Sequence, residues 1–381
     1  MPRFSSRSFV SLALLLVCGL ALLAHPPVAR AGTNADRTEP ARMLKPGSTQ
    51  PVFEIQTGIG GDIFPAFANY ASFQGLRERM WGTVTVTVSN STDALLRERI
   101  TVEVPGWSDR EIRLVEVAPG QVAKFLFAPS FLPRLYENRE LTAATALVTV
   151  TDEGGNVVFD ATAPVRIRSA EDMYWGSGFQ YAPFIASWVT PHDSRVEEVL
   201  AQAKEFVPGR RLPGYEAGKP AAVQRRSTTI QAQAIYRALQ QVGLSYVKSS
   251  GAFGSRGNAP VAERVRLPRE SLEHVSANCI DGAVLYASLF ENLGMDAVVV
   301  LVPGHAYVGV RLAEKAEDYL YLETALTGRA SFESAVQSAE RGLAKYPKIK
   351  VLRIPINQSR QAGIFPMPEP HSREEQAVTR R

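Results

Sequence analysis

Hydrophobic and polar positions alternate with a period of two through the first half of the chain, between about residues 51 and 168. Thr83–Val88 is the clearest case, and Ile100–Val104 follows it after a turn, so the two are expected to form a half-buried antiparallel pair. Further strands are predicted at residues 112–117, 122–127, 143–151, 157–159 and 165–167. Several short strands with turns between them, and no convincing helix, predict an immunoglobulin-like β-sandwich over residues 51–170.

The apolar spacing changes to a helical period after about residue 171, where a second, α+β domain is expected over residues 171–365. Asp193-Ser194 is typical of a helix start, Thr228–Val242 predicts a second helix stopped by Gly243, and Pro268 opens a short third one. Loops are expected at residues 208–226 and 253–259. The aromatic stretch from Met173 to Trp188 is expected to pack the two domains together.

The most informative stretch begins at Asn278. This residue is a good helix cap, Asp281 three positions later completes an approximate capping pair, and Cys279 falls in the first turn. The helix that follows is apolar nearly all round until Gly294, so it is expected to be buried with its start at a surface cleft. Unpaired N–H groups and the positive end of the helix dipole favour thiolate over thiol at Cys279, and the same N–H groups could hold an oxyanion.

A pair of strands is expected to bring a histidine and a carboxylate together. After the apolar strand Ala297–Val302, the run His305–Leu312 alternates, with His305 and Tyr307 on the face opposite Ala306 and Val308. The next strand places Glu323 opposite its own apolar residues. If the apolar faces of this hairpin share one core, His305 and Glu323 lie on the same face near the same end.

The first 31 residues are expected to be a signal peptide. Arg3 and Arg7 precede the apolar run Phe9–Ala24, and Ala29-Arg30-Ala31 is typical of a cleavage site. The run falls short of the roughly 20 residues of a membrane span, so an uncleaved anchor is the minority alternative, and no later segment approaches that length. Residues 32–50 are predicted to be a flexible linker, and residues 366–381 a disordered tail.

Removing this leader changes the charge and the cysteine count. The whole chain has a net charge of +4, but without the three leader arginines 39 basic residues face 38 acidic ones, which does not indicate nucleic-acid binding. Cys18 leaves with the leader, so Cys279 is the single thiol of an exported protein. A buried, inert cysteine is the alternative for Cys279 taken alone.

In these motifs the chain resembles the transglutaminase-like superfamily, whose core is shared with papain-type cysteine proteases. The motifs are Asn278–Asp281 opening a buried helix, Gly304–Val308 on a strand and Tyr321–Thr324 on the next, and the resemblance covers about residues 188–354. It implies Cys279 as the nucleophile, His305 as general base and then acid, and Glu323 as the orienting carboxylate. That family more often has Asp in the third position, which leaves Asp318 as the alternative. For an oxyanion donor we expect the Cys279 N–H, with Trp188 or Asn278 as a side-chain partner.

The expected function is an exported cysteine-dependent acyl-transfer enzyme. It would attack peptide or isopeptide bonds of a protein or peptide substrate in the cell envelope through a thioester, with hydrolysis favoured over cross-linking and no cofactor. A catalytically inactive binding or assembly module is the alternative from another class. A metal site made of Cys279, His305 and Glu323 is less favoured, because no close His or Cys pair supports it.

Overall fold

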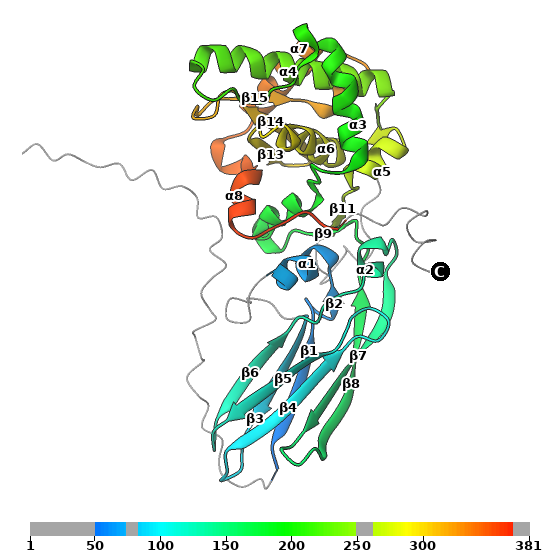
Figure 1. Ribbon diagram of the computed structural model, residues 1–381, viewed down its shortest axis with the longest axis vertical. Coiled ribbons are helices and arrows are strands. Elements are labelled where there is room, and N and C mark those ends of the chain that lie inside the picture. The colour runs from blue at the N-terminus through cyan, green and yellow to red at the C-terminus, as the bar shows by residue number, and fades with distance from the viewer. Residues whose placement is uncertain (1–49, 74–82, 249–261, 369–381) are drawn as a thin grey trace, which may run out of the picture.

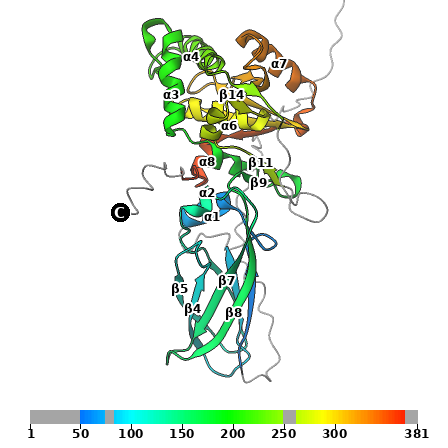
Figure 2. The same cartoon turned by 90° about the vertical axis from the view of Figure 1, so that its right-hand side faces the viewer.

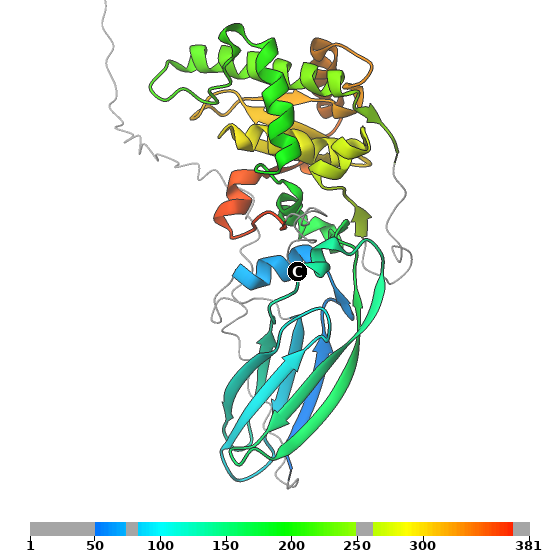
Figure 3. The same cartoon turned by 45° about the vertical axis from the view of Figure 1, so that its right-hand side comes forward.

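The computed structural model describes residues 50–73, 83–248 and 262–368, and it is a mixed α+β protein with several sheets. A β-rich N-terminal part and a helix-rich C-terminal part are stacked end to end in an elongated molecule (Figures 1 and 3). The predicted signal peptide, nearly all of the predicted linker and the expected loop 253–259 lie outside the described residues. Within the described residues, no helix is long and apolar enough to cross a membrane.

Two sheets form the N-terminal part. The smaller has the order β1 (Val52–Thr57), β3 (Val84–Ser89), β6 (Val122–Phe127). The larger has the order β2 (Asp62–Ile63), β8 (Val157–Ile167), β7 (Thr142–Thr151), β4 (Leu96–Glu103), β5 (Glu111–Val117). Strand β1 lies beside β8 and β5 beside β6, so the strands curl as a half-barrel around shared apolar side chains.

Two predictions for this part were wrong. The strands β3 and β4 do not pair with each other, because β3 lies between β1 and β6 while β4 lies between β5 and β7. Alternation correctly identifies the buried faces of both strands, but it carries no information about the partner. The part also contains helices, α1 (Pro65–Phe73) and α2 (Arg134–Glu137). Helix α1 is apolar nearly all round and therefore lacks the apolar stripe by which a surface helix is recognised.

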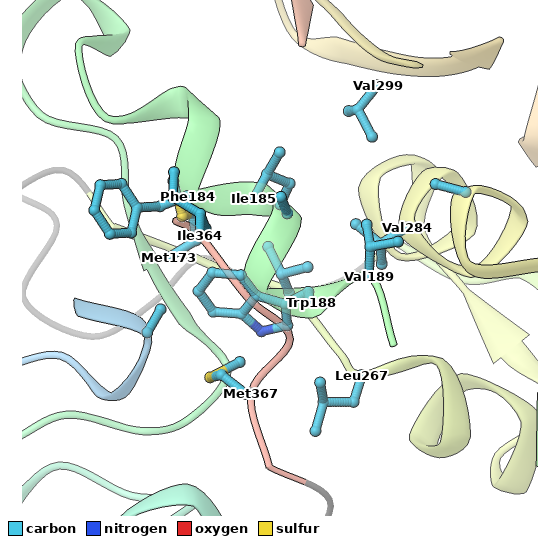
Figure 4. Packing of buried hydrophobic residues seen from close by; sticks show 14 of the residues in the cluster. Met173, Phe184, Ile185, Trp188, Val189, Leu267, Val284, Val299, Ile364 and Met367 are labelled. Atoms are coloured by element: carbon cyan, nitrogen blue, oxygen red, sulfur yellow. The ribbon is translucent and has the colours of Figure 1, made fainter. Parts of the chain in front are cut away.

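Aromatic side chains join the two parts, as the sequence predicts for the Met173–Trp188 stretch. Phe67 of α1 stacks on Phe184 of the 3₁₀ segment η2 (Ala182–Trp188), with ring centroids 4.0 Å apart. The fully buried Trp188 lies in the same apolar core (Figure 4). Met367 is buried as well and donates its N–H to the Ser187 carbonyl at 2.8 Å, so the predicted tail does not begin at residue 366. Strands β9 (Asp172–Tyr174) and β11 (Ala262–Arg264) form a small antiparallel sheet nearby.

The C-terminal part is built on a four-stranded antiparallel sheet between helices (Figure 2). Its order is β15 (Tyr319–Leu322), β14 (His305–Arg311), β13 (Ala297–Val302), β16 (Leu352–Pro355). Helix α6 (Cys279–Asn292) packs on one face and α7 (Phe332–Ala344) on the other. The remaining helices are α3 (Ser194–Ala203), α4 (Ala221–Val242), α5 (Pro268–Glu273) and α8 (Ile356–Gln361).

The predicted helix starts in this part are mostly correct. Asp193 caps α3 by accepting a hydrogen bond from the Arg195 N–H, and Pro268 is the first residue of α5. Helix α4 is the exception, because it begins at Ala221 and not at residue 228, which shortens the expected loop. Its first turns carry Arg225 and Arg226, which resemble loop residues in the sequence but stay at least partly exposed on the helix, while Gln224 is buried.

Candidate active site

The start of helix α6 is fixed by reciprocal hydrogen bonds. The Asp281 N–H donates to Asn278 Oδ1 at 2.8 Å, and the Asn278 N–H donates to Asp281 Oδ2 at 3.2 Å. The other oxygen of Asp281 accepts from the Arg266 N–H at 2.9 Å. Burial raises the pKa of Asp281, although these backbone hydrogen bonds lower it in part. Asp281 therefore holds the helix start, and Cys279 stands in the first turn as a partly exposed free thiol.

A two-residue turn places His305 at the beginning of β14. Val302 pairs with His305 across the hairpin, so Pro303 and Gly304 alone form the connection. Proline fixes its own φ, and Gly304 adopts a φ of +77°, which is the combination that a type II turn requires. The turn thereby ties the position of His305 to the rigid strand β13.

Strand register brings Glu323 to His305. Val308 faces Leu322 and Val310 faces Leu320, so the two apolar faces coincide as the alternation predicts. Glu323 follows β15 directly, and its Oε2 lies 2.8 Å from His305 Nε2. Its Oε1 accepts from the Ala325 N–H at 3.2 Å, so both carboxylate oxygens are occupied in a largely buried side chain. The face that carries His305 is not an open polar face, because α7 covers Tyr307 on it.

His305 also contacts the thiol. Burial lowers the pKa of His305, but hydrogen bonds to the Cys279 side chain and to Glu323, together with their negative charges, raise it by more, to about 10. Glu323 occupies Nε2, which leaves Nδ1 as the ring nitrogen for the thiol. The His305 imidazole can therefore remain a cation at neutral pH.

The first turn of α6 also lies close to Thr324, the residue after Glu323. The sequence analysis did not find this contact, which holds Cys279 near Glu323. The Thr324 hydroxyl, next to Glu323, donates to the Cys279 carbonyl at 3.4 Å. A Cβ at Gly282 would lie 2.6 Å from the Thr324 Oγ1, so only glycine lets the first turn of α6 approach this closely. A glycine inside an otherwise apolar helix was the available signal.

Tyrosine rings border the site, and the sequence analysis missed Tyr246. His305 meets Tyr307 edge-on, with centroids 4.7 Å apart and an interplanar angle of 84°. Tyr246 is 45% exposed and lies on β10 (Ser245–Tyr246), which pairs with β12 (Ser276–Ala277) directly before the α6 cap. Burial, followed by the charges of Cys279 and Glu323, raises the pKa of Tyr246. An exposed ring beside the thiol is a surface on which a substrate can rest.

The alternative residues lie elsewhere or have other roles. Asp318 is at the opposite end of the hairpin and forms a two-point ion pair with Arg225, at 2.9 and 3.0 Å. The side chain of Trp188 is 0% exposed, so its indole N–H cannot reach a substrate oxygen in this conformation. The amide oxygen of Asn278 caps α6. Glu323 is thus the carboxylate that the fold brings to His305.

The polar groups at the site engage one another. Nε2 of His305 is occupied by Glu323, and the Cys279 side chain is close enough to raise the pKa of His305. Over residues 50–73, 83–248 and 262–368, no three His, Cys, Asp or Glu side chains are grouped as ligands of a metal ion.

No protein-family model matches the chain. No curated protein is similar to it in sequence.

Proposed function

We propose that the chain is a cysteine-dependent acyl-transfer enzyme with Cys279 as its nucleophile. The observation that carries the proposal is the hydrogen-bonded series from the Cys279 thiol through His305 to Glu323 at the start of a capped helix. A thiol, a base within reach and a third group that orients the base are the arrangement that activates a nucleophile.

In the first step, the Cys279 thiolate attacks the carbonyl carbon of an amide. The charge that develops on the carbonyl oxygen faces the N–H groups of the first turn of α6, beginning with that of Cys279. The imidazolium of His305 donates its proton to the amide nitrogen as the carbon–nitrogen bond breaks, which releases an amine and leaves a thioester. Glu323 stabilises the cation until that proton is transferred and holds the ring orientation.

In the second step, water or a second amine attacks the thioester carbonyl. Neutral His305 accepts the proton of the attacking group, the carbon–sulfur bond breaks, and the thiolate and imidazolium re-form. With water the reaction is hydrolysis and with an amine it is transamidation. We favour hydrolysis, and the substrate class is a peptide or isopeptide bond in a protein or peptide.

The likeness of the motifs to the transglutaminase-like superfamily supports the same proposal at the level of fold. We propose that the C-terminal part is a transglutaminase-like, papain-like domain and that the N-terminal part is an immunoglobulin-like β-sandwich that presents it. The leader-like first 31 residues support an exported protein whose substrates lie in the cell envelope.

Alkylation of the native protein by iodoacetamide tests the activated thiol. Cys279 should react faster than N-acetylcysteine at pH 6, because the adjoining His305 and the start of helix α6 activate the thiol. His305→Ala should slow the reaction at pH 6 by roughly tenfold or more. His192→Ala, which removes an exposed histidine at the start of α3, is the matched control and should leave the rate unchanged.

The second assay looks for the thioester itself. The purified protein is mixed with cell-envelope extract, quenched in acid and analysed for a mass increase on Cys279. An acylated Cys279 in the native protein, absent from His305→Ala, supports the enzyme. A thiol no more reactive than N-acetylcysteine, together with full biological function of Cys279→Ala, would instead identify a binding or assembly module.

A further inference from the structure

A short turn between α7 and β16 exposes a large apolar side chain. Ile349 lies at the centre of the 3₁₀ turn η6 (Lys348–Lys350), and 94% of its surface is exposed, against 77% for Leu114. Lys348 and Lys350 flank it, and we call these three residues the Lys-Ile-Lys tip. Isolated isoleucines are common on protein surfaces. An isoleucine that is almost fully exposed and flanked by two lysines, however, contributes nothing to packing in the core.

The tip is an ordered turn that is anchored on both sides. Tyr346 before it and Val351 after it both pack in the second apolar cluster, between the sheet and α7. Two hydrogen bonds close the turn, from the Lys350 N–H to the Pro347 carbonyl at 2.8 Å and from the Val351 N–H to the Lys348 carbonyl at 3.1 Å. Apolar neighbours therefore lie on both sides of Ile349, yet its side chain points away from them.

The charged residues next to the tip in the sequence have a single sign. Residues 341–353 include five basic residues and no acidic one. Within the described parts of the chain, Arg341, Lys345, Lys348 and Lys350 form no ion pair, and Arg353 rests on the Tyr321 ring and donates to its hydroxyl. The nearest acidic residue in the sequence is the exposed Glu340 of α7. The segment thus combines unpaired cations with the protruding Ile349 and, at 38% exposure, Leu352.

Strand pairing places the tip at the same end of the sheet as His305. Val302 pairs with His305 on one side of β13, and Leu301 pairs with Leu352 on the other side. The chain that leads from the tip into β16 therefore enters the sheet at the end where β14 begins. Two inter-strand steps separate β16 from β14, which is on the order of 10 Å.

We propose that the Lys-Ile-Lys tip docks the protein on an anionic membrane surface. Lysine and arginine are drawn to acidic headgroups, with a gain of roughly fivefold in affinity for each charge near the surface. Ile349 would leave water by entering the boundary between headgroups and acyl chains. A nucleic acid or an acidic sugar polymer would use the cations alone and would leave Ile349 in water, so the isoleucine favours a lipid surface.

The docked orientation has a consequence that rests on the proposed function. Because the tip and His305 share one end of the sheet, docking would hold Cys279 close to the membrane surface. The substrates would then be peptide bonds presented near that surface, such as those of membrane-anchored proteins.

Co-sedimentation of the purified protein with lipid vesicles tests the docking. The protein should sediment with vesicles of phosphatidylglycerol and phosphatidylcholine, more at low than at physiological salt, and should remain in solution with phosphatidylcholine alone. Replacing both tip lysines, Lys348→Gln with Lys350→Gln, should weaken binding roughly 30-fold. Ile349→Ser should weaken it roughly tenfold or more.

Control variants carry single substitutions of the same kind far from the tip. Leu114→Ser on β5 removes another exposed apolar side chain, and Arg237→Gln removes an exposed cation of α4, and both should bind vesicles as the native protein does. Ile349→Trp provides a second measurement, since the fluorescence of the added indole should shift to shorter wavelength when anionic vesicles are present.

Three results would overturn the docking: a native protein that stays in solution with anionic vesicles at low salt, an Ile349→Ser variant that binds normally while the lysine variant does not, or an Ile349→Trp variant whose fluorescence does not shift. The second result would identify a binder of polyanions that does not enter a bilayer. Cys279→Ala should bind vesicles normally, so a failure of the proposed chemistry would leave this measurement unaffected.

Discussion

Buried polar side chains are distributed differently in the two parts of the molecule. In the N-terminal part some complete a local turn or edge, as Asn90 and Ser108 do, and others form the buried ion-paired group of Asp62, Arg168 and Asp172, which contains no nucleophile. In the C-terminal part Asn278, Glu323 and Thr324 converge on the first turn of one helix. Burying polar groups is costly unless each is satisfied, so their gathering at one thiol indicates a site, while the polar groups of the N-terminal part support the fold.

The strongest test of this contrast is Glu323→Gln, which keeps the shape of the side chain and removes its charge. Burial lowers the pKa of His305, and the contacts to Cys279 and Glu323 raise it to about 10, so removing the Glu323 charge should lower that pKa. We expect the rate of acyl transfer to fall by about 10²- to 10⁴-fold. The alkaline limit of the pH–rate profile should move to lower pH, because the imidazolium that protonates the leaving amine is lost earlier.

The same substitution should change stability in a stated direction. The folded pKa of His305 lies above its unfolded value of about 6.5, so the stability that its charge contributes is complete below pH 6.5 and is lost as pH rises towards 10. The native protein should therefore have a higher unfolding free energy than Glu323→Gln. This difference should be largest near pH 6.5 and should shrink as the pH rises towards 10. Urea unfolding of both proteins at several pH values measures this difference. A difference that grows with pH would contradict a charged His305–Glu323 pair.

A smaller effect on stability is expected from a substitution at Gly282, where helix propensity and steric crowding act in opposite directions. Alanine is favoured over glycine in a helix by about 1 kcal/mol, but its Cβ would lie 2.6 Å from the Thr324 Oγ1, and overpacking costs roughly 1–3 kcal/mol. Gly282→Ala should therefore destabilise the protein by about 1 kcal/mol and slow alkylation of Cys279.

The effect of Gly282→Ala on stability should change sign when the Thr324 side chain is removed. In a Thr324→Gly background both crowding atoms of residue 324 are absent, so Gly282→Ala should become stabilising by up to about 1 kcal/mol. Unfolding of the four proteins of this cycle gives the coupling. If Gly282→Ala has the same effect with and without Thr324, the close approach of α6 to residue 324 is not what requires glycine.

The same contrast explains what could be predicted from the sequence. Alternation in β14 and β15 predicted which faces coincide, and the His305–Glu323 contact follows from that register because the two residues are joined by one short hairpin. The capping pair at Asn278 is local as well. By contrast, the partners of β3 and β4 depend on strands far away in the sequence, and the contact of Gly282 with Thr324 depends on how a helix lies on a sheet. Periodicity contains neither kind of information.

The smallest effect on the site is expected from Asn90→Ala in the N-terminal part, although this substitution should destabilise the protein. Asn90 is fully buried, and its Nδ2 donates to the Ala94 and Val117 carbonyls at 2.8 Å each, where the chain crosses from β3 to β4. Asn90→Ala removes both of these hydrogen bonds from a buried site and should lower the unfolding free energy by about 1–3 kcal/mol. Because no polar group of the Cys279 site depends on Asn90, alkylation of the folded variant should proceed at the native rate. An alkylation rate that falls together with stability would show that the two parts are energetically coupled through their aromatic junction, and the polar groups of the N-terminal part would then support the site as well as the fold.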